Sequence, residues 1–313
     1  MIPELSDILA AQKRIDKYIN HTPVMTSGQL NKIFDSELYF KCENFQKVGA
    51  FKFRGAINAV LSLTSNEKKN GVVTHSSGNH AAALTLAARA NGVKAYIVMP
   101  ENAPEVKKNA VSGYGAEITF CKPTLQARED TTATIMKRTG ASLIHPYDNY
   151  DVICGQGTAS LELMEEIHGL DIVVAPVGGG GLMSGTATCV KGGNSKIKVV
   201  GAEPLNANDA YISLTTGVLT PSKNPISIAD GLLTSLSELT FSIIKTKVDK
   251  IFTAKEESIR DSMLLVWERM KIIIEPSSAT VLAIIRENPD YFRGKRVGLI
   301  ISGGNVDFRK LPF

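Results

Sequence analysis

The chain has 313 residues, a length that predicts about two domains and allows a large buried core. Hydrophobic residues make up 43% and charged residues 21% of the sequence, which is typical of a globular protein and excludes disorder as the main state. The net charge of +4 is spread along the chain, without a basic stretch interleaved with aromatic residues. Nucleic acid is therefore not an expected partner.

Cysteines and histidines narrow the class of protein further. The four cysteines stand far apart with no Cys-x-x-Cys pair, as expected of small buried thiols in a reducing compartment, so we predict a cytoplasmic protein. The five histidines lack the spacing of zinc ligands. Neither an export signal nor a run of about 18 apolar residues is found, so no membrane partner is expected.

Short β-branched runs alternate along the chain with longer segments of helical period, which predicts an α/β protein with parallel strands. Strands are expected at Glu37–Cys42, Gly71–Thr74, Lys94–Met99, Glu117–Phe120, Ser142–His145, Asp171–Val177, Lys196–Ala202, Lys250–Thr253 and Arg296–Ile301. Helices are expected at Lys52–Leu63, Asn79–Ala90, Glu105–Ser112, Leu125–Arg138, Cys154–His168, Leu182–Lys191, Lys255–Met270 and Ser277–Glu287.

The nine expected strands are too many for one small sheet. The four strands between Gly71 and His145 alternate regularly with helices and could form a sheet of their own. We therefore predict a small α/β domain, residues 68–145, inserted in a large domain made of residues 1–67 and 146–313. The stretch Thr220–Ile228 contains Pro and Ser and is predicted to be a surface loop.

A run of four glycines, Gly178, Gly179, Gly180 and Gly181, follows the apolar strand that ends at Val177 and precedes a helical pattern. Consecutive glycines at a helix N-terminus expose several backbone N–H groups to an anion, and the helix dipole adds partial positive charge. A flexible loop is the alternative, but such loops seldom lie between a buried strand and a helix. The run predicts a phosphate site of neither the dinucleotide nor the Walker type.

A second strand-to-helix turn contains Ser76, Ser77, Gly78, Asn79 and His80. Ligands of open α/β folds bind at this carboxyl edge of the sheet. The two serines could instead serve only as a helix N-cap. The side chains of Asn79 and His80 add hydrogen-bonding groups that capping does not need.

A lysine between two phenylalanines, Lys52, stands at the start of a predicted helix. Most lysines are solvated surface charges. Apolar neighbours and a helix N-terminus both disfavour the ammonium form, however, and lower the pKa as an amine nucleophile requires.

Together these features resemble one family, the pyridoxal-phosphate (PLP) enzymes of the tryptophan-synthase-β fold, in the serine racemase and threonine dehydratase branch. The resemblance covers nearly the whole chain. It implies two open, twisted, mostly parallel sheets flanked by helices, with the cofactor bound by the large domain. The segments that carry it are Phe45–Gly55, Ser76–His80, Gly155–Thr158, Gly178–Leu182, Val266–Lys271, Ile274–Pro276 and Ser302–Asn305.

The resemblance implies a role for each cofactor-binding residue. Lys52 would carry PLP as a Schiff base, and Phe51 would pack near the cofactor ring. The glycines 178 to 181 and the N–H of Leu182 would hold the 5′-phosphate, while Asn79 would hydrogen-bond the ring hydroxyl. Ser302 would meet the pyridine nitrogen with a hydroxyl, which leaves that nitrogen neutral and makes the ring a weaker electron sink. Such a ring favours prompt loss of a β-leaving group.

The substrate and a cation are also assigned by the resemblance. Ser76, Ser77, Asn79 and His80 would surround the substrate carboxylate, and Arg128 is a candidate for extra contacts from the small domain. The segment after the strand Lys196–Ala202 resembles the cation site of the racemases. Its ligands would be the carboxylates of Glu203 and Asp209 and the carbonyl of Ala207. Oxygen ligands suit Mg²⁺, Ca²⁺ or Mn²⁺, although without the family a solvated loop would be the interpretation.

Differences within the family select among its members. His80 and the Phe-Lys-Phe-Arg-Gly segment argue against β-replacement enzymes. Biosynthetic threonine dehydratases usually have Ala directly before the glycine of the serine turn and often a regulatory C-terminal domain. Ser77 at that position and the end at Phe313 therefore point to the racemase type. The same Ser-Ser-Gly-Asn-His pattern occurs in hydroxyaspartate dehydratases, so the motif leaves both activities open.

The predicted function is a homodimeric PLP-dependent serine racemase with β-elimination activity on L-serine and related 3-hydroxy amino acids. Lys52 would take the Cα proton, and Ser77 would return one from the opposite face. The alternative is a threonine or threo-3-hydroxyaspartate dehydratase of the same fold. A hypothesis of another class is a non-catalytic regulator that binds a phosphate ligand, which would lack the Schiff base.

Overall fold

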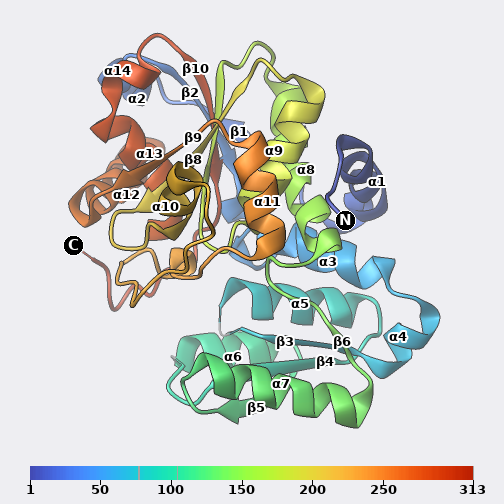
Figure 1. The fold of residues 1–313 in the computed structure, drawn as a ribbon. Coiled ribbons are helices and arrows are strands. Elements are labelled where there is room, and N and C mark those ends of the chain that lie inside the picture. Colours follow the sequence, from blue (N-terminus) through green and yellow to red (C-terminus); the bar gives the residue numbers. More distant parts are fainter. Residues whose placement is uncertain (77, 104, 313) are drawn as a thin grey trace.

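The protein has an α/β architecture with two separate sheets (Figure 1). The computed structural model describes residues 1–76, 78–103 and 105–312. Within these residues, the larger sheet has the strand order β1-β2-β10-β7-β8-β9 and the smaller sheet the order β5-β4-β3-β6. Neighbouring strands run parallel, apart from β1, which pairs antiparallel with β2. The predicted fold class is confirmed.

The strands are β1 (Val24–Met25), β2 (Glu37–Cys42), β3 (Val72–His75), β4 (Ala95–Pro100), β5 (Glu117–Cys121), β6 (Ser142–Leu143), β7 (Ile172–Pro176), β8 (Lys198–Pro204), β9 (Lys250–Ala254) and β10 (Arg296–Ile301). The helices are α1 (Leu5–Ile15), α2 (Gly28–Phe34), α3 (Lys52–Ser62), α4 (Ser65–Asn70), α5 (Asn79–Ala90), α6 (Glu105–Gly113), α7 (Leu125–Thr139), α8 (Tyr150–Glu166), α9 (Gly181–Gly193), α10 (Asp209–Thr216), α11 (Glu238–Lys247), α12 (Glu256–Met270), α13 (Pro276–Glu287) and α14 (Pro289–Phe292). Among the described residues, no helix is both long and apolar enough to cross a bilayer.

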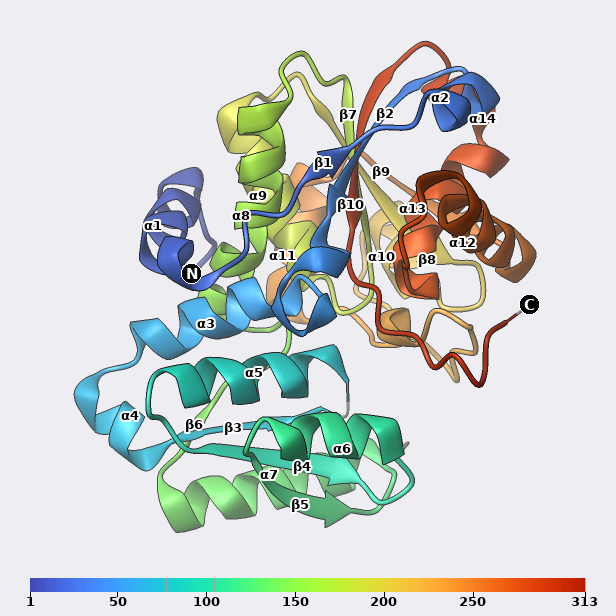
Figure 2. The same cartoon turned by 180° about the vertical axis from the view of Figure 1, so that it is seen from behind.

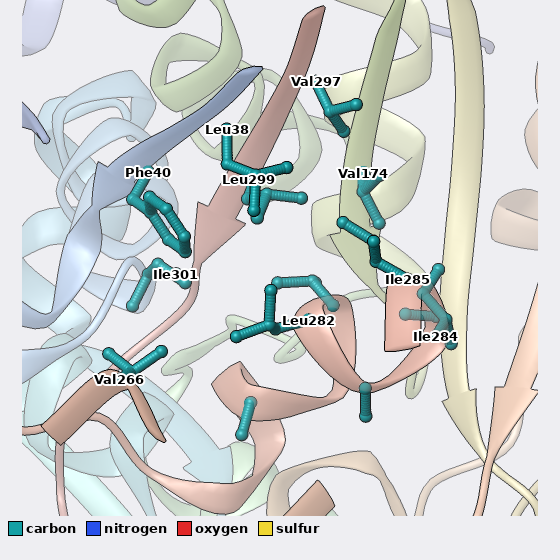
Figure 3. Packing of buried hydrophobic residues seen from close by; sticks show 14 of the residues in the cluster. Leu38, Phe40, Val174, Val266, Leu282, Ile284, Ile285, Val297, Leu299 and Ile301 are labelled. Atoms are coloured by element: carbon teal, nitrogen blue, oxygen red, sulfur yellow. The ribbon is translucent and has the colours of Figure 1, made fainter. Parts of the chain in front are cut away.

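The large sheet is covered by helices on both faces, which explains why its central strands are almost continuous apolar runs. Successive side chains of a strand point to opposite faces. On β7, Val174 packs in the cluster with Leu282 of α13, whereas Val173 packs in the cluster with Met183 of α9. Figure 3 shows the α13 side of this core, with side chains of β2, β7 and β10 meeting those of α13.

The small sheet follows the same rule. Val72 of β3 shares a cluster with Leu84 of α5, and its neighbour Val73 shares one with Ile135 of α7. The four strands between Gly71 and His145 thus form their own sheet between α5 and α7. The division into domains at residues 67 and 145 stays a prediction.

Helix α3 lies between the two sheets (Figure 2). It packs against α8 of the large layer and α5 of the small one. Its buried residues Ile57 and Val60 belong to the same cluster as Leu84 of α5 and Val152 of α8. Lys52, the first residue of α3, is therefore held where the two parts of the molecule meet.

Some expected boundaries were wrong. The strand predicted for Ser142–His145 ends at Leu143, because His145 Nδ1 accepts the backbone N–H of Asp148 in a turn. The helix expected from Cys154 already begins at Tyr150, because the side chain of Asn149 caps it by accepting the N–H of Val152. The prediction also lacked β1 and the helices α1, α2, α4, α10, α11 and α14.

Candidate active site

The four glycines form a backbone surface after β7. Gly180 has φ +86°, a conformation that favours glycine, and the next residue begins α9. A Cβ on Gly178 would lie 3.0 Å from the carbonyl oxygen of Gly231, and one on Gly181 would lie 2.9 Å from Cα of Tyr147. A Cβ on Gly179 would overlap the ring of Tyr147. Neighbouring residues therefore pack directly against the backbone of these glycines and leave no room for a side chain.

The start of α9 leaves N–H groups available to a ligand. The first N–H groups of a helix, here those of Gly181 and Leu182, have no acceptor within the helix. They point out of the N-terminal end, where the helix dipole is positive. The geometry of the glycine loop therefore suits an anionic group such as a phosphate. Its role as a phosphate site stays a prediction.

Lys52 is half-buried beside this loop. Its Nζ donates a hydrogen bond to the carbonyl of Pro146, 2.9 Å away, and lies 5.0 Å from the centre of the Phe51 ring. Pro146 precedes Tyr147, whose ring covers Gly179, so one short segment joins the lysine to the glycine loop. Burial lowers the pKa of Lys52 to about 8, although the Glu275 carboxylate acts in the opposite direction.

The turn after β3 approaches the same region. Asn79, the first residue of α5, donates through Nδ2 to the carboxylate of Glu275 at 3.2 and 3.3 Å. Its Oδ1 accepts a hydrogen bond from Asn305 Nδ2 at 3.0 Å. These bonds link the small sheet to the large one and fix which way the Asn79 amide faces. Ser76 Oγ accepts the N–H of Gly78 at 3.3 Å, and Ser77 lies outside the described residues.

The imidazole of His80 is buried and faces a carbonyl. Its Nε2 lies 3.0 Å from the carbonyl oxygen of Ile144, which can only accept, so Nε2 carries the proton. Burial, and then the charge of Lys52, lower the pKa of His80 to about 3. The ring is neutral at physiological pH, and its remaining nitrogen is an acceptor. A carboxylate would therefore be bound by the backbone N–H groups of this helix end and not by a cationic His80.

Ser302 follows β10 and lies next to the start of α3. Its carbonyl oxygen accepts the N–H of Phe51 at 2.9 Å, and its neighbour Gly303 forms a β-bridge with Ala50. The Ser302 hydroxyl is buried and lies 3.0 Å from the hydroxyl of Ser278. The structure thus brings Ser302, Phe51 and Lys52 together.

Arg128 is located on α7 of the small layer. It is half-buried, and its Nε donates weakly to the carbonyl of Thr124 at 3.4 Å. After burial, the charge of Arg128 is the next cause of the lowered pKa of His75. Its role toward a substrate stays a prediction.

The predicted cation ligands lie together in a buried turn. Glu203 ends β8 with Pro204 and is fully buried, as are Ala207 and Asp209 to within 2%. Glu203 accepts the N–H groups of Ala210 and Tyr211, while Asp209 Oδ1 has no partner among the described residues. Burial and the charge of Asp209 raise the pKa of Glu203 well above its ordinary value, and burial raises that of Asp209 to about 6. Two buried carboxylates with an open oxygen suit a cation, although the described residues hold no group of three acidic, His or Cys side chains.

A buried ion cluster lies two residues from Lys52. Arg54 donates to Glu43 through Nε at 2.7 Å and to Glu162 through Nη1 at 2.6 Å. Lys41 also contacts Glu162, at 2.6 Å. All four side chains are buried. This cluster ties α3 to β2 and α8 and so fixes the helix that carries Lys52.

Three residues near the site received no role from the sequence. Glu275 and Asn305 stand in segments that carried the resemblance, but only the structure shows that they hold Asn79. Tyr147, which covers the glycine loop, stands in no recognised motif. Its only signal was its position just after the strand that ends near His145.

The residues present fit PLP. A backbone anion site, a half-buried amine with a pKa of about 8 and a buried hydroxyl match its phosphate, its aldehyde and its ring nitrogen in chemical type. Lys52, the glycine loop and Ser302 are the groups that would hold the cofactor.

Comparison with known proteins points to the same family of enzymes. Residues 15–303 match the family model described as pyridoxal-phosphate dependent enzyme. A serine racemase of Dictyostelium discoideum is 55% identical over 98% of this chain and 96% of its own. A beta-hydroxyaspartate dehydratase of Paracoccus denitrificans is 48% identical over 100% and 99%. The solved structure of maize serine racemase is 40% identical, covers 99% of this chain and 95% of its own, and superposes with a TM-score of 0.97.

With a family match over most of its length and relatives of this identity, the chain belongs to the pyridoxal-phosphate dependent enzymes, in the branch that contains serine racemases and hydroxy-amino-acid dehydratases.

Proposed function

We propose that the protein is a serine racemase that also eliminates the β-hydroxyl of L-serine and related 3-hydroxy amino acids. The observation that carries the proposal is the placement of Lys52: a half-buried amine that reaches the segment covering an anion-binding glycine loop. The identity of 55% to a serine racemase supports this choice of substrate.

PLP, when bound, supplies an electron-poor ring that stabilises negative charge at the Cα of an amino acid. The residues of the chain would supply the rest. Gly178 to Gly181 and the N–H of Leu182 would hold the phosphate, and the Ser302 hydroxyl would serve the ring nitrogen. Asn79 would orient the ring through its amide, whose direction is set by Glu275 and Asn305.

Lys52 acts as the base in this proposal. An amine with a pKa of about 8 is neutral in a much larger fraction of molecules at neutral pH than an ordinary lysine, so it can accept the Cα proton of L-serine. Ser77 returns a proton to the opposite face, which gives D-serine. If the β-hydroxyl leaves before the proton returns, the products after hydrolysis are pyruvate and ammonia. Ser76, the N–H groups at the start of α5 and Arg128 bind the substrate carboxylate.

A second candidate function is a dehydratase acting on threonine or threo-3-hydroxyaspartate. The identity of 48% to a beta-hydroxyaspartate dehydratase over the full chain favours it. The two candidates share the cofactor, the lysine and the elimination step, and they differ in whether a proton is returned to the second face.

Three further properties belong to this proposal. A divalent cation, Mg²⁺, Ca²⁺ or Mn²⁺, binds Glu203, Asp209 and the carbonyl of Ala207, supported by the buried Asp209 oxygen that has no partner within the described part of the chain. The protein works in the cytoplasm, supported by four cysteines that are all free and buried. It forms a homodimer, an expectation carried only by the family resemblance.

The test is a product assay over L-serine, D-serine, L-threonine and the threo-3-hydroxyaspartates, with chiral separation of amino acids and detection of keto acids. D-serine and pyruvate from L-serine are the expected products. Keto acid without any D-serine would favour the dehydratase. A cofactor-supplemented protein without a visible absorption band that borohydride abolishes would overturn both candidates in favour of a non-catalytic binder of a phosphate ligand.

A further inference from the structure

The hydroxyl of Ser278 lies directly behind that of Ser302. Ser278 is the third residue of α13, and Ser302 follows β10. Both side chains are buried, and their oxygens are 3.0 Å apart. The two residues are 24 positions apart in the chain, so this contact was not visible in the sequence.

Ser278 has a full set of hydrogen bonds. A hydroxyl carries one proton and two acceptor positions. Ser278 Oγ accepts the N–H of Gly303 at 2.7 Å and lies 2.7 Å from the Gly303 carbonyl oxygen, to which it can donate. That carbonyl also accepts the N–H of Glu275 at 3.0 Å, so it keeps a partner if the Ser278 proton turns away. Ser278 can therefore donate its proton either to the Gly303 carbonyl oxygen or to Ser302 Oγ.

Two arrangements of protons follow. In one, Ser278 donates to Gly303 and Ser302 donates to Ser278, so that Ser302 presents only acceptor positions elsewhere. In the other, Ser278 donates to Ser302, and the Ser302 proton is released to point at another acceptor. No buried hydroxyl loses its hydrogen bond in either arrangement, which avoids the cost of an unpaired buried polar group.

We propose that Ser278 is a positioning residue for the cofactor ring: by donating to Ser302 Oγ, it directs the Ser302 proton toward the ring nitrogen of PLP and strengthens that hydrogen bond. The inference rests on the proposed function, since it requires PLP at Lys52 and its ring nitrogen at Ser302. Hydrogen bonds in a chain polarise one another, so a donor behind Ser302 makes Ser302 a better donor. The ring nitrogen is thereby kept in its unprotonated, accepting form.

The test uses cofactor-free protein titrated with PLP, in which binding is followed by the visible absorption band. Ser278→Ala is expected to raise the dissociation constant of PLP about 3- to 10-fold, the range for one lost neutral hydrogen bond. Its kcat for L-serine should fall while KM stays near the wild-type value. Thr280→Val is the matched control, because it removes another buried hydroxyl of α13, one that donates to the backbone carbonyl of Pro276 in the same helix.

A double-mutant cycle separates action through Ser302 from a structural role at Gly303. If Ser278 acts through Ser302, Ser278→Ala has no further effect on PLP affinity in a Ser302→Ala background. An equal loss in both backgrounds, or no loss in either, would overturn the inference. Ser278→Cys keeps the size of the side chain with a much weaker donor and serves if the alanine variant does not fold, with a weaker affinity expected again. A wild-type protein without the visible band would instead remove the proposed function itself.

Discussion

Two basic residues at the start of α3, the half-buried Lys52 and the fully buried Arg54, differ in the groups that their side chains contact. Arg54 contacts both oxygens of Glu43 and both oxygens of Glu162. Burial would lower the pKa of Arg54, but these carboxylates outweigh it and raise the pKa above the ordinary value. Lys52 donates to a neutral carbonyl, and burial lowers its pKa to about 8.

The different contacts of these two residues give them different roles: Arg54 is structural, and Lys52 is suited to chemistry. A buried cation matched by carboxylates is fixed in charge and holds elements together. A buried amine without a contacting carboxylate loses its proton easily and can act as a nucleophile and base. The same helix turn therefore anchors the site on one side and supplies its reactive group on the other.

The largest expected effect is that of Lys52→Met on activity. Loss of the amine removes the cofactor anchor and the Cα base together, so racemisation and elimination should both fall by about 10³-fold or more. Turnover of L-serine and the borohydride-sensitive absorption band measure the two roles. Lys47→Met is the control for a lysine of the same segment, whose amine bonds to the carbonyl of Tyr18. Substantial turnover in Lys52→Met would end the assignment.

Arg54→Met should have the opposite profile. It leaves Glu43 and Glu162 buried without their main partner, so the free energy of unfolding should fall by about 3–5 kcal/mol. The same replacement at Lys52 should change it by less than about 1 kcal/mol, because the hydrogen bond that is lost there goes to a neutral carbonyl and not to a buried carboxylate. Denaturant unfolding of both cofactor-free variants gives the comparison. An equal loss of unfolding free energy in the two variants would contradict the proposed difference between Arg54 and Lys52.

The pH dependence of PLP capture tests whether the pKa of Lys52 is lowered in the folded protein. The neutral amine is the form that reacts with an aldehyde, so PLP capture by cofactor-free protein should quicken as the pH rises and level off above about 8. Below that value, the rate should change about tenfold per pH unit, since the neutral fraction does. A rise that continues to the ordinary lysine pKa, about 10.4, would mean that burial does not tune Lys52.

The smallest expected effect concerns the cation site. A cation bound only by the folded protein stabilises it by about 2.7 kcal/mol at one hundred times its dissociation constant. Excess Mg²⁺ should therefore raise the melting temperature relative to EDTA, and Asp209→Asn should abolish the difference. Identical melting of the wild-type protein in both conditions would contradict cation binding at Glu203 and Asp209.

Local sequence patterns were sufficient for most strands of the two sheets and for the position of the glycine loop. The bounds of β2 and β10 were predicted to the residue, because both are short runs of mainly apolar residues that end at polar or turn residues. The glycine loop was also found, because four consecutive glycines between a buried strand and a helix are typical of a backbone anion site. Strand β1 was missed because two residues leave no periodic pattern.

Long-range contacts could not be predicted. Asn79 and Glu275 are 196 residues apart, and Arg54 and Glu162 are 108 apart, so no local pattern links them. The neutral state of His80 depends on burial and on the charge of Lys52, neither of which is visible in the turn that contains it. The sequence predicted which groups react, whereas the structure was needed to find which residues contact and orient them.

The central claim is that Lys52 and Ser77 address opposite faces of one substrate carbon. Its most direct test is the ratio of D-serine to pyruvate formed from L-serine by Ser77→Ala and by the wild-type protein. Racemisation needs both faces, while elimination from L-serine needs only the lysine face. The ratio should therefore fall by about 10²-fold, the usual range for losing a positioned acid or base, while pyruvate is still formed. An unchanged ratio would contradict the claim and remove Ser77 from the catalytic residues.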